Sequence, residues 1–476
     1  MTVLNRRNFL AGSAASFAGA TGVLGSLSAA AATNTTGYKA LVCVFFKGGW
    51  DSADVVLPYD QASLDQLEGL RPGLFQAYAN RSTPSSRSRD ALLRLSAANE
   101  GSFGGRQFAF PPEFAELQSV FNSNDLAIVG NVGPLIEPTD SDSFAEQSVE
   151  LPKRLFSHND QQSTWQSLGT EGTRYGWGGR FVDAAIASDT TANPLYAAIS
   201  TGGNDVFLSG ETAKQFTASN GNSPRELNIV EREWLIGGND RYDEVRRRLE
   251  AFYERDDFGH SNLMKQDFAD ISANGVANVK AYNQARASVT PLQTVFPESS
   301  LGRQLKTVVE TVEARAGLNV SRQVFYVQIG GFDTHNNQAS SMPGRLSEIS
   351  QAFGAFREAL VERNLWNSVT TFTASDFGRT TIDNGDGTDH GWGAHHLVMG
   401  GAVNGGRIYG DLPAHDLSLP AYEPQRGRMI PTTSVEQYAA TLGGWFGLDI
   451  ADLNAALPNL RNFAQTNIGF MSGQSA

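Results

Sequence analysis

The sequence has few of the features that mark specialised classes of protein. Among its 476 residues it has one cysteine, Cys43, so no disulfide can form within the chain. Cys43 lies in an apolar run that is typical of a buried strand, where a thiol behaves as a small unreactive hydrophobe. We therefore expect neither a disulfide framework nor a cysteine nucleophile.

Long apolar runs and an excess of positive charge are also lacking. No stretch approaches the roughly 20 apolar residues that a membrane-spanning helix needs, so we expect no stable membrane span. Acidic residues outnumber basic ones by 50 to 37, which gives a formal charge of −13. A chain this acidic is a poor partner for nucleic acid or for an anionic membrane surface.

The N-terminus differs from the rest of the chain. Residues 5–10 carry a twin-arginine pattern, Asn-Arg-Arg-Asn-Phe-Leu, and Ala- and Gly-rich residues follow as far as Ala32. This pattern predicts that residues 1–32 are a twin-arginine (Tat) signal peptide, with an amphipathic helix or membrane anchor as the alternative. The Tat export machinery is then a partner, and the mature protein is periplasmic or secreted. Cleavage there removes two arginines and no acid, which takes the formal charge from −13 to −15.

The remaining chain alternates buried strands with helices. Nearly continuous apolar runs predict strands at 38–46, 126–132, 323–329 and 369–373, with a further strand at 194–199. Apolar residues spaced by four and three between Met342 and Leu360 predict a helix, so 323–373 forms a βαβ unit. Other helices are expected at 114–121, 240–253, 302–316 and 434–446, and one is expected to follow Ser157 as its N-cap. The fold class is α/β, a doubly wound, mostly parallel sheet with helices on both faces. We expect one domain over 38–465, with insertions at about 60–115 and 217–300.

Three predicted strands end in the same way, with small residues followed by an acid. The acids are Asp51, Asp333 and Asp376. Because parallel strands bring their carboxyl ends to one edge of the sheet, these acids can meet although they are far apart in sequence. Adjacent carboxylates repel and raise one another's pKa, and a divalent cation removes that cost. Each acid alone also fits an ordinary turn, a cap or a loop salt bridge.

Histidines lie close to these acids in the sequence. His335 follows Asp333 by two positions, so both side chains can face one ion in an extended segment. His390 and His158 are further candidate ligands, with a loop histidine and a core histidine as the alternatives. His395 and His396 point to opposite sides of a strand, so at most one joins the site, and we favour His396. Imidazole and carboxylate ligands suit zinc first, with manganese or calcium as alternatives. The run from Asp383 to Asp389 loosely resembles a calcium loop but lacks the EF-hand spacing, which favours a solvated loop.

An ordered set of motifs resembles a known family. The motifs are GGWDS, LFSHNDQQSTW, GGFDTH, SDFGRT, GTDHGWGAHH, LVMGGAVNGGRIYG and EQYAATLGGWFG, and they run from about Lys39 to Phe446. They are similar to those of the exported bacterial family known as domain of unknown function 1501 (DUF1501). That family resembles the alkaline phosphatase and sulfatase superfamily, which implies a doubly wound α/β fold with metal ligands at the strand ends. The resemblance implies Asp51, Asp333, His335, Asp376 and His390 as ligands.

The chain departs from that superfamily in places that bear on catalysis. Members with two metals typically have His where this chain has Phe377, so one of two metal sites is expected to be incomplete. Ser157 is our preferred nucleophile, because a helix N-terminus and a metal would both lower the pKa of its hydroxyl. Ser52 is the second choice, and Ser157 as a simple cap is the alternative. Arg379 is expected to clamp a phosphate or sulfate oxygen, with a structural ion pair as the alternative.

These residues predict an exported, metal-dependent hydrolase whose substrates are small anionic phosphate or sulfate esters. Its metal ions would be held by Asp and His at the strand ends, and metal would activate Ser157 or a water. The second hypothesis belongs to another class, a catalytically inactive exported binding or cell-surface assembly protein with the same fold. The clustered Asp and His residues favour the enzyme, whereas Phe377 and the uncertain nucleophile favour the alternative.

Overall fold

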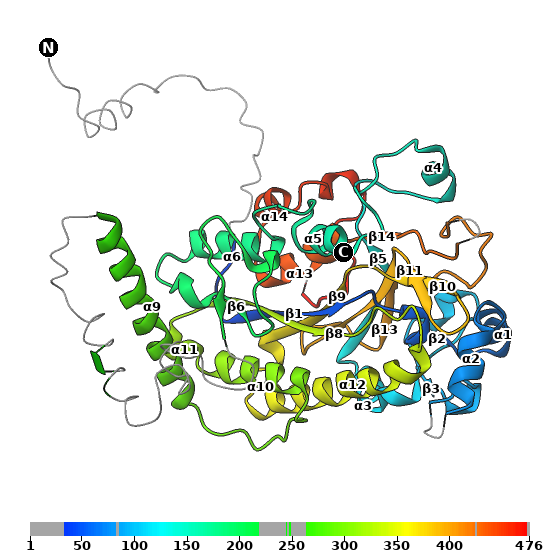
Figure 1. The fold of residues 1–476 in the computed structure, drawn as a ribbon, viewed down its shortest axis with the longest axis horizontal. Helices are drawn as coiled ribbons and strands as arrows, with labels where there is room; N and C mark the ends of the chain where they lie inside the picture. The colour runs from blue at the N-terminus through cyan, green and yellow to red at the C-terminus, as the bar shows by residue number, and fades with distance from the viewer. Residues whose placement is uncertain are drawn as a thin grey trace, which may run out of the picture. The chain divides into compact units, whose positions relative to one another are not determined.

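The computed structural model describes residues 33–81, 85–218, 263–423 and 426–473, together with residues 244, 247 and 248. Residues 32–476 form one compact unit, which is drawn in Figure 1. The predicted signal peptide and most of the predicted helix at 240–253 lie outside the described residues.

A nine-stranded sheet forms the centre of the fold. Its strands lie in the order β13-β5-β12-β9-β1-β8-β6-β7, and β14 also pairs with β5. Neighbouring strands are parallel except for β12, which is antiparallel to both β5 and β9. The predicted mostly parallel sheet is therefore confirmed, with one reversed strand inside it. The strands are β1 (Lys39–Lys47), β5 (Leu126–Gly133), β6 (Ala198–Ser200), β7 (Phe216–Thr217), β8 (Arg322–Gly330), β9 (Val369–Ser375), β12 (Ala394–Met399), β13 (Arg407–Gly410) and β14 (Thr433–Ser434).

The central strand β1 shows why the sheet is covered on both faces. Residues 40–46 are all buried, and successive side chains point to opposite sides. Val42 and Val44 belong to one hydrophobic cluster and Leu41 and Phe45 to the other. Helices supply the opposite wall of each cluster, so the doubly wound arrangement is confirmed (Figure 1). The first cluster contains residues of α3 (Ala115–Asn122), α9 (Leu263–Ala287), α10 (Ser300–Glu313), α11 (Arg315–Leu318) and α12 (Gln338–Glu362), and the second contains residues of α5 (His158–Ser167), α6 (Trp177–Ser188), α13 (Val435–Phe446) and α14 (Ile450–Ala456).

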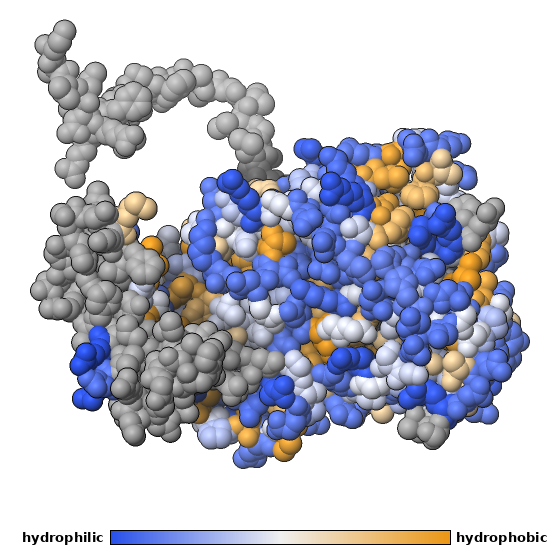
Figure 2. Space-filling model, viewed as in Figure 1, coloured by the Kyte–Doolittle hydropathy of each residue, from blue (hydrophilic) through white to orange (hydrophobic). Residues whose placement is uncertain are grey.

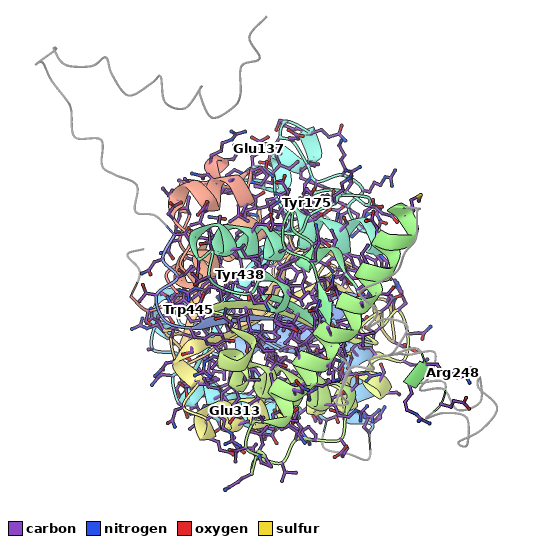
Figure 3. The ribbon with its side chains drawn as sticks, turned by 90° about the vertical axis from the view of Figure 1, so that its left-hand side faces the viewer. Glu137, Tyr175, Arg248, Glu313, Tyr438 and Trp445 are labelled. Atoms are coloured by element: carbon purple, nitrogen blue, oxygen red, sulfur yellow. The ribbon has the colours of Figure 1, made fainter. Side chains whose placement is uncertain are left out.

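Helix α13 illustrates how the sequence fixes one of these helices. Ser434 accepts a hydrogen bond from the backbone N–H of Gln437, whose side chain accepts one from the N–H of Ser434, so a capping box starts the helix. Tyr438 and Trp445, labelled in Figure 3, are buried residues of α13 that belong to the second hydrophobic cluster. The Tyr438 hydroxyl lies 3.3 Å from the carbonyl of Thr373, which satisfies its polar end in the core.

The segment at 60–115 has more regular structure than the loops that the sequence predicts there. Helices α1 (Gln61–Leu70) and α2 (Pro72–Ala79) lie in the chain between the strands of a small antiparallel sheet, β2 (Leu57–Pro58), β4 (Phe108–Phe110) and β3 (Leu93–Arg94), in this spatial order. Leu57, Leu64, Leu67 and Leu92 form a hydrophobic cluster of their own. Such short elements carry no periodic signal, which is why the sequence pattern does not reveal them.

One further stretch differs in detail from the sequence prediction. Residues 194–199, predicted as a strand, form a 3-10 turn at 194–196 before the short strand β6. Within the predicted insertion at 217–300, Leu263–Ala287 form the helix α9, and most of residues 219–262 lie outside the described residues. No helix of the described residues is long and apolar enough to cross a membrane. Hydrophilic side chains dominate the surface in view in Figure 2.

Glu436, in the first turn of α13, should make stability depend on pH. Burial raises its pKa from 4.5 to about 7, so the folded protein holds this proton more tightly than the unfolded chain does. Its contribution to stability is therefore lost as pH rises from about 4.5 to about 7. We expect Glu436→Gln to raise the free energy of unfolding at pH 8 by on the order of 2–3 kcal/mol and to change it little at pH 4. Urea unfolding at both values measures this, with Glu137→Gln as the control; an equal effect at the two pH values would contradict it.

Candidate metal centre

The three predicted strand ends meet at one edge of the sheet. β1 pairs with β8 and with β9 in parallel, so Lys47 lies opposite Gly330 and Phe46 opposite Ser375. Gly48 follows β1 with a φ of +119°, and a side chain on it would lie 2.4 Å from the backbone nitrogen of Asp333. Glycine is needed here both for the left-handed backbone and for the close approach of the neighbouring strand end. This close approach places Asp333 beside the end of β1.

Asp333 is the acid around which three histidines gather. Its Oδ1 lies 3.1 Å from His335 Nε2 and 3.5 Å from His390 Nε2. Its Oδ2 lies 3.5 Å from His158 Nε2. The three histidines come from different elements, α5, the loop after β8, and β11 (Thr388–His390). One donor atom each from His158, Asp333 and His390 lies within 4.8 Å of the other two.

The other nitrogen of each imidazole faces an oxygen. His390 Nδ1 lies against a backbone carbonyl, which can only accept, so this nitrogen carries the hydrogen and Nε2 keeps its lone pair. Carboxylates hold the Nδ1 atoms of the other two histidines and favour the same tautomer. In that tautomer each Nε2 has a lone pair that could bind an ion beside Asp333, although the Asp333 carboxylate, 3.1 Å from His335 Nε2, equally favours a hydrogen on that nitrogen. The three contacts are His158 Nδ1 with Asp376 Oδ2 at 2.6 Å, His335 Nδ1 with Asp389 Oδ1 at 3.2 Å, and His390 Nδ1 with the Phe156 oxygen at 2.8 Å.

This arrangement offers donor atoms that could hold a cation. The Nε2 atoms of His335 and His390 are 2.9 Å apart, and both would present lone pairs in the tautomers just described. His158 Nε2 is shielded from solvent and has no hydrogen-bond partner. One imidazole nitrogen each from His158 and His390 and a carboxylate oxygen of Asp333 lie close enough together to hold one ion, with His335 beside them, and zinc takes donors of this type in proteins. Calcium prefers six to eight oxygen ligands, so the set fits calcium poorly.

The electrostatics of the centre favour binding a positive ion. Burial tends to raise the pKa of Asp333, but the hydrogen bond and charge of Arg379 outweigh it, and the pKa is lowered. Burial lowers the pKa of His390, which keeps it neutral. The hydrogen bond to Asp376 raises the pKa of His158, so an ion must compete there with a proton.

Asp376, predicted as a ligand, hydrogen-bonds to His158 and is not among the donor atoms that lie together around Asp333. Its Oδ2 accepts hydrogen bonds from the side chain of Gln162 at 2.9 Å and from the backbone of Gly48 at 3.2 Å, besides its contact with His158. The carboxylate is fully buried, and its Oδ1 has no hydrogen-bond partner. In this geometry Asp376 orients a donor histidine. Phe377 beside it packs on His158, with ring centroids 4.8 Å apart.

Asp51, also predicted as a ligand, is not brought into the group around Asp333. Both of its oxygens bind the Arg71 guanidinium, at 2.8 and 2.9 Å, and Oδ2 also accepts from Gln338 at 2.6 Å. Arg71 also donates hydrogen bonds to the backbone carbonyls of Thr380 and Thr381, each at 2.7 Å. Asp51 and Arg71 are both about 2 % exposed, so this is a buried ion pair.

Arg379 and Ser157 lie beside the centre, each with a protein partner. Arg379 is buried and donates to Asp333 Oδ1 and to the carbonyl of Gly48, both at 2.9 Å. Its remaining nitrogens bond to Thr388. The guanidinium thus serves as a structural partner of Asp333 in this structure. Ser157 is half-buried at the start of α5, and its hydroxyl donates to Asp160 at 2.9 Å rather than capping the helix.

His395 and His396 lie on opposite sides of β12, as predicted, and neither reaches Asp333. His396 faces Trp165 and bonds to the Thr373 hydroxyl at 3.1 Å. His395 accepts from the backbone of Asn131 at 2.9 Å. Burial lowers the pKa of both to about 3, so both are neutral core histidines. The favoured candidate His396 is therefore separate from the cluster.

Phe156 and Arg428 also shape the centre, although the sequence does not single them out. Phe156 has a φ of +73°, which is rare for a bulky residue, and this conformation presents its carbonyl to His390. The Arg428 guanidinium stacks over the Phe156 ring at 3.8 Å and donates to the His390 carbonyl at 2.8 Å. One side chain thus holds both His390 and the residue that orients it. A left-handed Phe leaves no sequence signal, since the pattern around it is that of an ordinary loop.

Comparisons with known proteins place the chain in a family without giving it an activity. The model of the family described as "Protein of unknown function (DUF1501)" matches residues 38–424. A comparison with curated proteins finds no match. Among solved structures, the chain is similar to Ps i-CgsB in complex with k-i-k-neocarrahexaose, at 11 % identity and a TM-score of 0.34, covering 90 % of this chain and 77 % of that one. It is also similar to the lipoteichoic acid synthase LtaP from Listeria monocytogenes, at 9 % identity and a TM-score of 0.27, covering 83 % and 74 %. At such scores function has to be argued from the site itself.

Proposed function

For this chain, which belongs to the DUF1501 family, we propose the function of an exported, metal-dependent hydrolase of phosphate or sulfate esters. One observation carries the proposal: three histidines, each fixed through Nδ1, direct Nε2 toward Asp333. His158, His335, His390 and Asp333 would hold the ion, and zinc suits these donors best. The bound ion would act as a Lewis acid on an ester oxygen. Export rests on the twin-arginine pattern of residues 5–10.

The residues around the centre would prepare it for this chemistry. Asp376, Asp389 and the Phe156 carbonyl each contact the Nδ1 atom of one histidine and so hold the three imidazole rings in place. Ser157 lies between Phe156 and His158 in sequence and at the N-terminus of α5, where the helix dipole lowers the pKa of a hydroxyl. Its hydrogen would pass to Asp160, which it already contacts at 2.9 Å. Ser157 or a water is therefore the nucleophile of the proposal.

The test measures metal content and turnover on the same preparation. Protein matured through its own export route should contain near-stoichiometric zinc or manganese by mass spectrometry and should hydrolyse an aryl phosphate or an aryl sulfate. Ser157→Ala should keep the metal and lose most of the turnover, whereas unchanged turnover would assign the attack to water. Metal-free protein that also fails with both esters would reject the hydrolase.

A second function has one observation in its favour. Arg379, the predicted anion clamp, uses its nitrogens on Asp333, Gly48 and Thr388 and so is engaged within the protein. A binding or assembly protein that keeps the metal and lacks turnover would need no such clamp. Stoichiometric metal together with no hydrolysis of any phosphate or sulfate ester would favour this function.

Arg428→Lys should weaken the metal centre from outside it. Lysine keeps the charge but cannot stack as a plane on Phe156 while donating to the His390 carbonyl. We expect metal affinity to fall by about 10- to 100-fold, as for other residues that orient metal ligands. Competition with a chromogenic chelator measures the affinity. Arg426→Lys, at a residue that is 66 % exposed in the same segment, is the control. Equal affinities of the two variants would remove Arg428 from the centre.

A further inference from the structure

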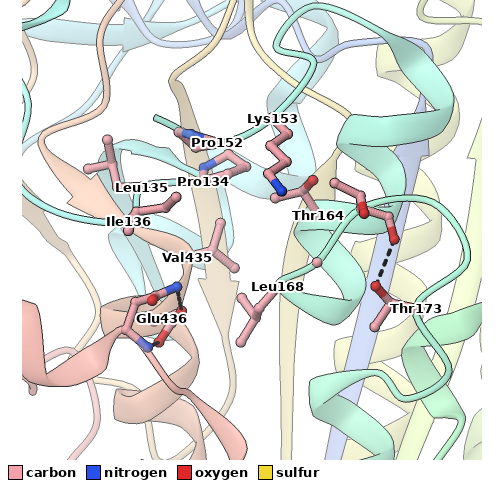
Figure 4. Close-up of a pocket in the computed structure, with 13 residues that line it drawn as sticks. Pro134, Leu135, Ile136, Pro152, Lys153, Thr164, Leu168, Thr173, Val435 and Glu436 are labelled. Carbon is pink, nitrogen blue, oxygen red and sulfur yellow. Dashed lines mark hydrogen bonds between the residues drawn. The ribbon is translucent and has the colours of Figure 1, made fainter. Parts of the chain in front are cut away.

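A cavity of about 310 Å³ lies beside α5 and shares no residue with the group around Asp333 (Figure 4). Several of its lining side chains are apolar: Leu135, Ile136, Leu168 and Val435. Its volume corresponds to about ten water molecules at the ~30 Å³ that each occupies in the liquid. The cavity is therefore large enough for a small organic molecule and offers that molecule an apolar surface.

Glu436 gives this cavity a fixed polar feature. The side chain lines the cavity although the residue is only 1 % exposed. Oε1 accepts from the Asn459 side chain and Oε2 from the Asn459 backbone, both at 2.8 Å. Among the described residues, no basic side chain forms an ion pair with Glu436. Glu436 thus contributes to the cavity wall a residue whose buried carboxylate is hydrogen-bonded to Asn459 and has no ion-pair partner among the described residues.

The chemistry of Glu436 selects the kind of group that would bind there. Burial raises its pKa to about 7, and the charge of Arg180, which forms no ion pair with Glu436, offsets this only in part. The hydrogen bonds from Asn459 and from the backbone N–H of Leu460 favour the ionised form. A cationic hydrogen-bond donor in direct contact would supply a closer positive charge than Arg180 does and would stabilise the ionised form further. Lys153 lines another side of the cavity (Figure 4) and disfavours a cation at that end, which orients the ligand.

We propose that this cavity binds a small amine, with the ammonium group at Glu436 and an apolar body against Ile136, Leu168 and Val435. Ligands of this class have an alkyl or aryl body of a few carbons and one primary ammonium group. The site is independent of the proposed hydrolase, because neither its residues nor its ligand chemistry involve the metal centre.

Isothermal titration calorimetry of the full chain at pH 8 tests the proposal with three probes of equal length, hexylamine, hexanol and hexanoate. Hexylamine should bind once per chain, and at least tenfold more tightly than hexanol or hexanoate. Glu436→Gln should weaken hexylamine by about 10- to 100-fold, the range for one charge-assisted hydrogen bond, and leave hexanol nearly unchanged. Ile136→Trp, which fills the cavity, should abolish binding of both.

The controls make each outcome decisive. Glu137→Gln changes a nearby acid that does not line the cavity and should bind hexylamine as the unaltered protein does. The thermal midpoint of each variant shows that it is folded. Equal affinity for hexylamine and hexanol, an unaffected Glu436→Gln variant, or no saturable binding of hexylamine would each overturn the proposal.

Discussion

Asp333→Ala is expected to lose the metal, with affinity falling by more than 100-fold, and to lose ester hydrolysis with it. The reason is its central position, since its two oxygens face the Nε2 atoms of His158, His335 and His390. A residue that only orients a ligand typically changes affinity by 10- to 100-fold, so loss of the ligand itself should exceed that. The substitution also leaves the buried Arg379 guanidinium without its carboxylate partner, and this positive charge would repel an incoming cation.

Two further variants separate the charge of Asp333 from its position. Asp333→Asn keeps an oxygen donor but not the charge, so it should retain part of the affinity that Asp333→Ala loses. Asp386→Asn changes an exposed acid of the loop that precedes β11 and is outside the donor group, so its metal content should match the unaltered protein. Mass spectrometry after dialysis against a weak chelator measures all three. Full metal retention in folded Asp333→Ala would show that the ion binds elsewhere.

The sequence predicts the frame of this fold well because long buried strands and amphipathic helices leave periodic signals. The apolar runs at 38–46 and 323–329 correspond to β1 and β8, and the helix expected between Met342 and Leu360 lies within α12. Strand β12 contains the adjacent pair His395 and His396, and its antiparallel direction could not be predicted. Direction depends on the path of the chain through the fold, which local periodicity does not encode.

For the candidate site, the sequence predicts which acids follow strands that end at one edge of the sheet. It does not predict where their side chains point. Strand pairing explains why Asp333, Asp376 and Asp51 follow strands that end at one edge. It does not set where each carboxylate points after its small-residue turn. Asp51 turns to Arg71, 20 residues later in the chain, and no spacing rule connects those two residues. The orienting role of Phe156 depends on a single left-handed φ, which sequence patterns do not report.

Arg71→Met is expected to destabilise the protein by about 3–5 kcal/mol, because it leaves the buried carboxylate of Asp51 without its counter-charge. Arg71 binds both Asp51 oxygens and two backbone carbonyls, and both partners are about 2 % exposed. Asp51→Asn should cost somewhat less, since Gln338 and the amide can still share hydrogen bonds. Urea unfolding followed by circular dichroism gives the free energy of unfolding of each variant.

The double variant Arg71→Met with Asp51→Asn shows whether the two residues act as a pair. If they do, its loss of stability should be smaller than the sum of the two single losses by about 1–3 kcal/mol, the coupling seen between contacting residues. The same cycle tests the sequence hypothesis that Asp51 is a metal ligand. As a structural partner of Arg71, Asp51 should leave the metal content of the folded protein unchanged when it becomes Asn. Additive losses of stability together with loss of metal in Asp51→Asn would instead assign Asp51 to the metal, and Arg71 would then be a neighbour that the ion displaces.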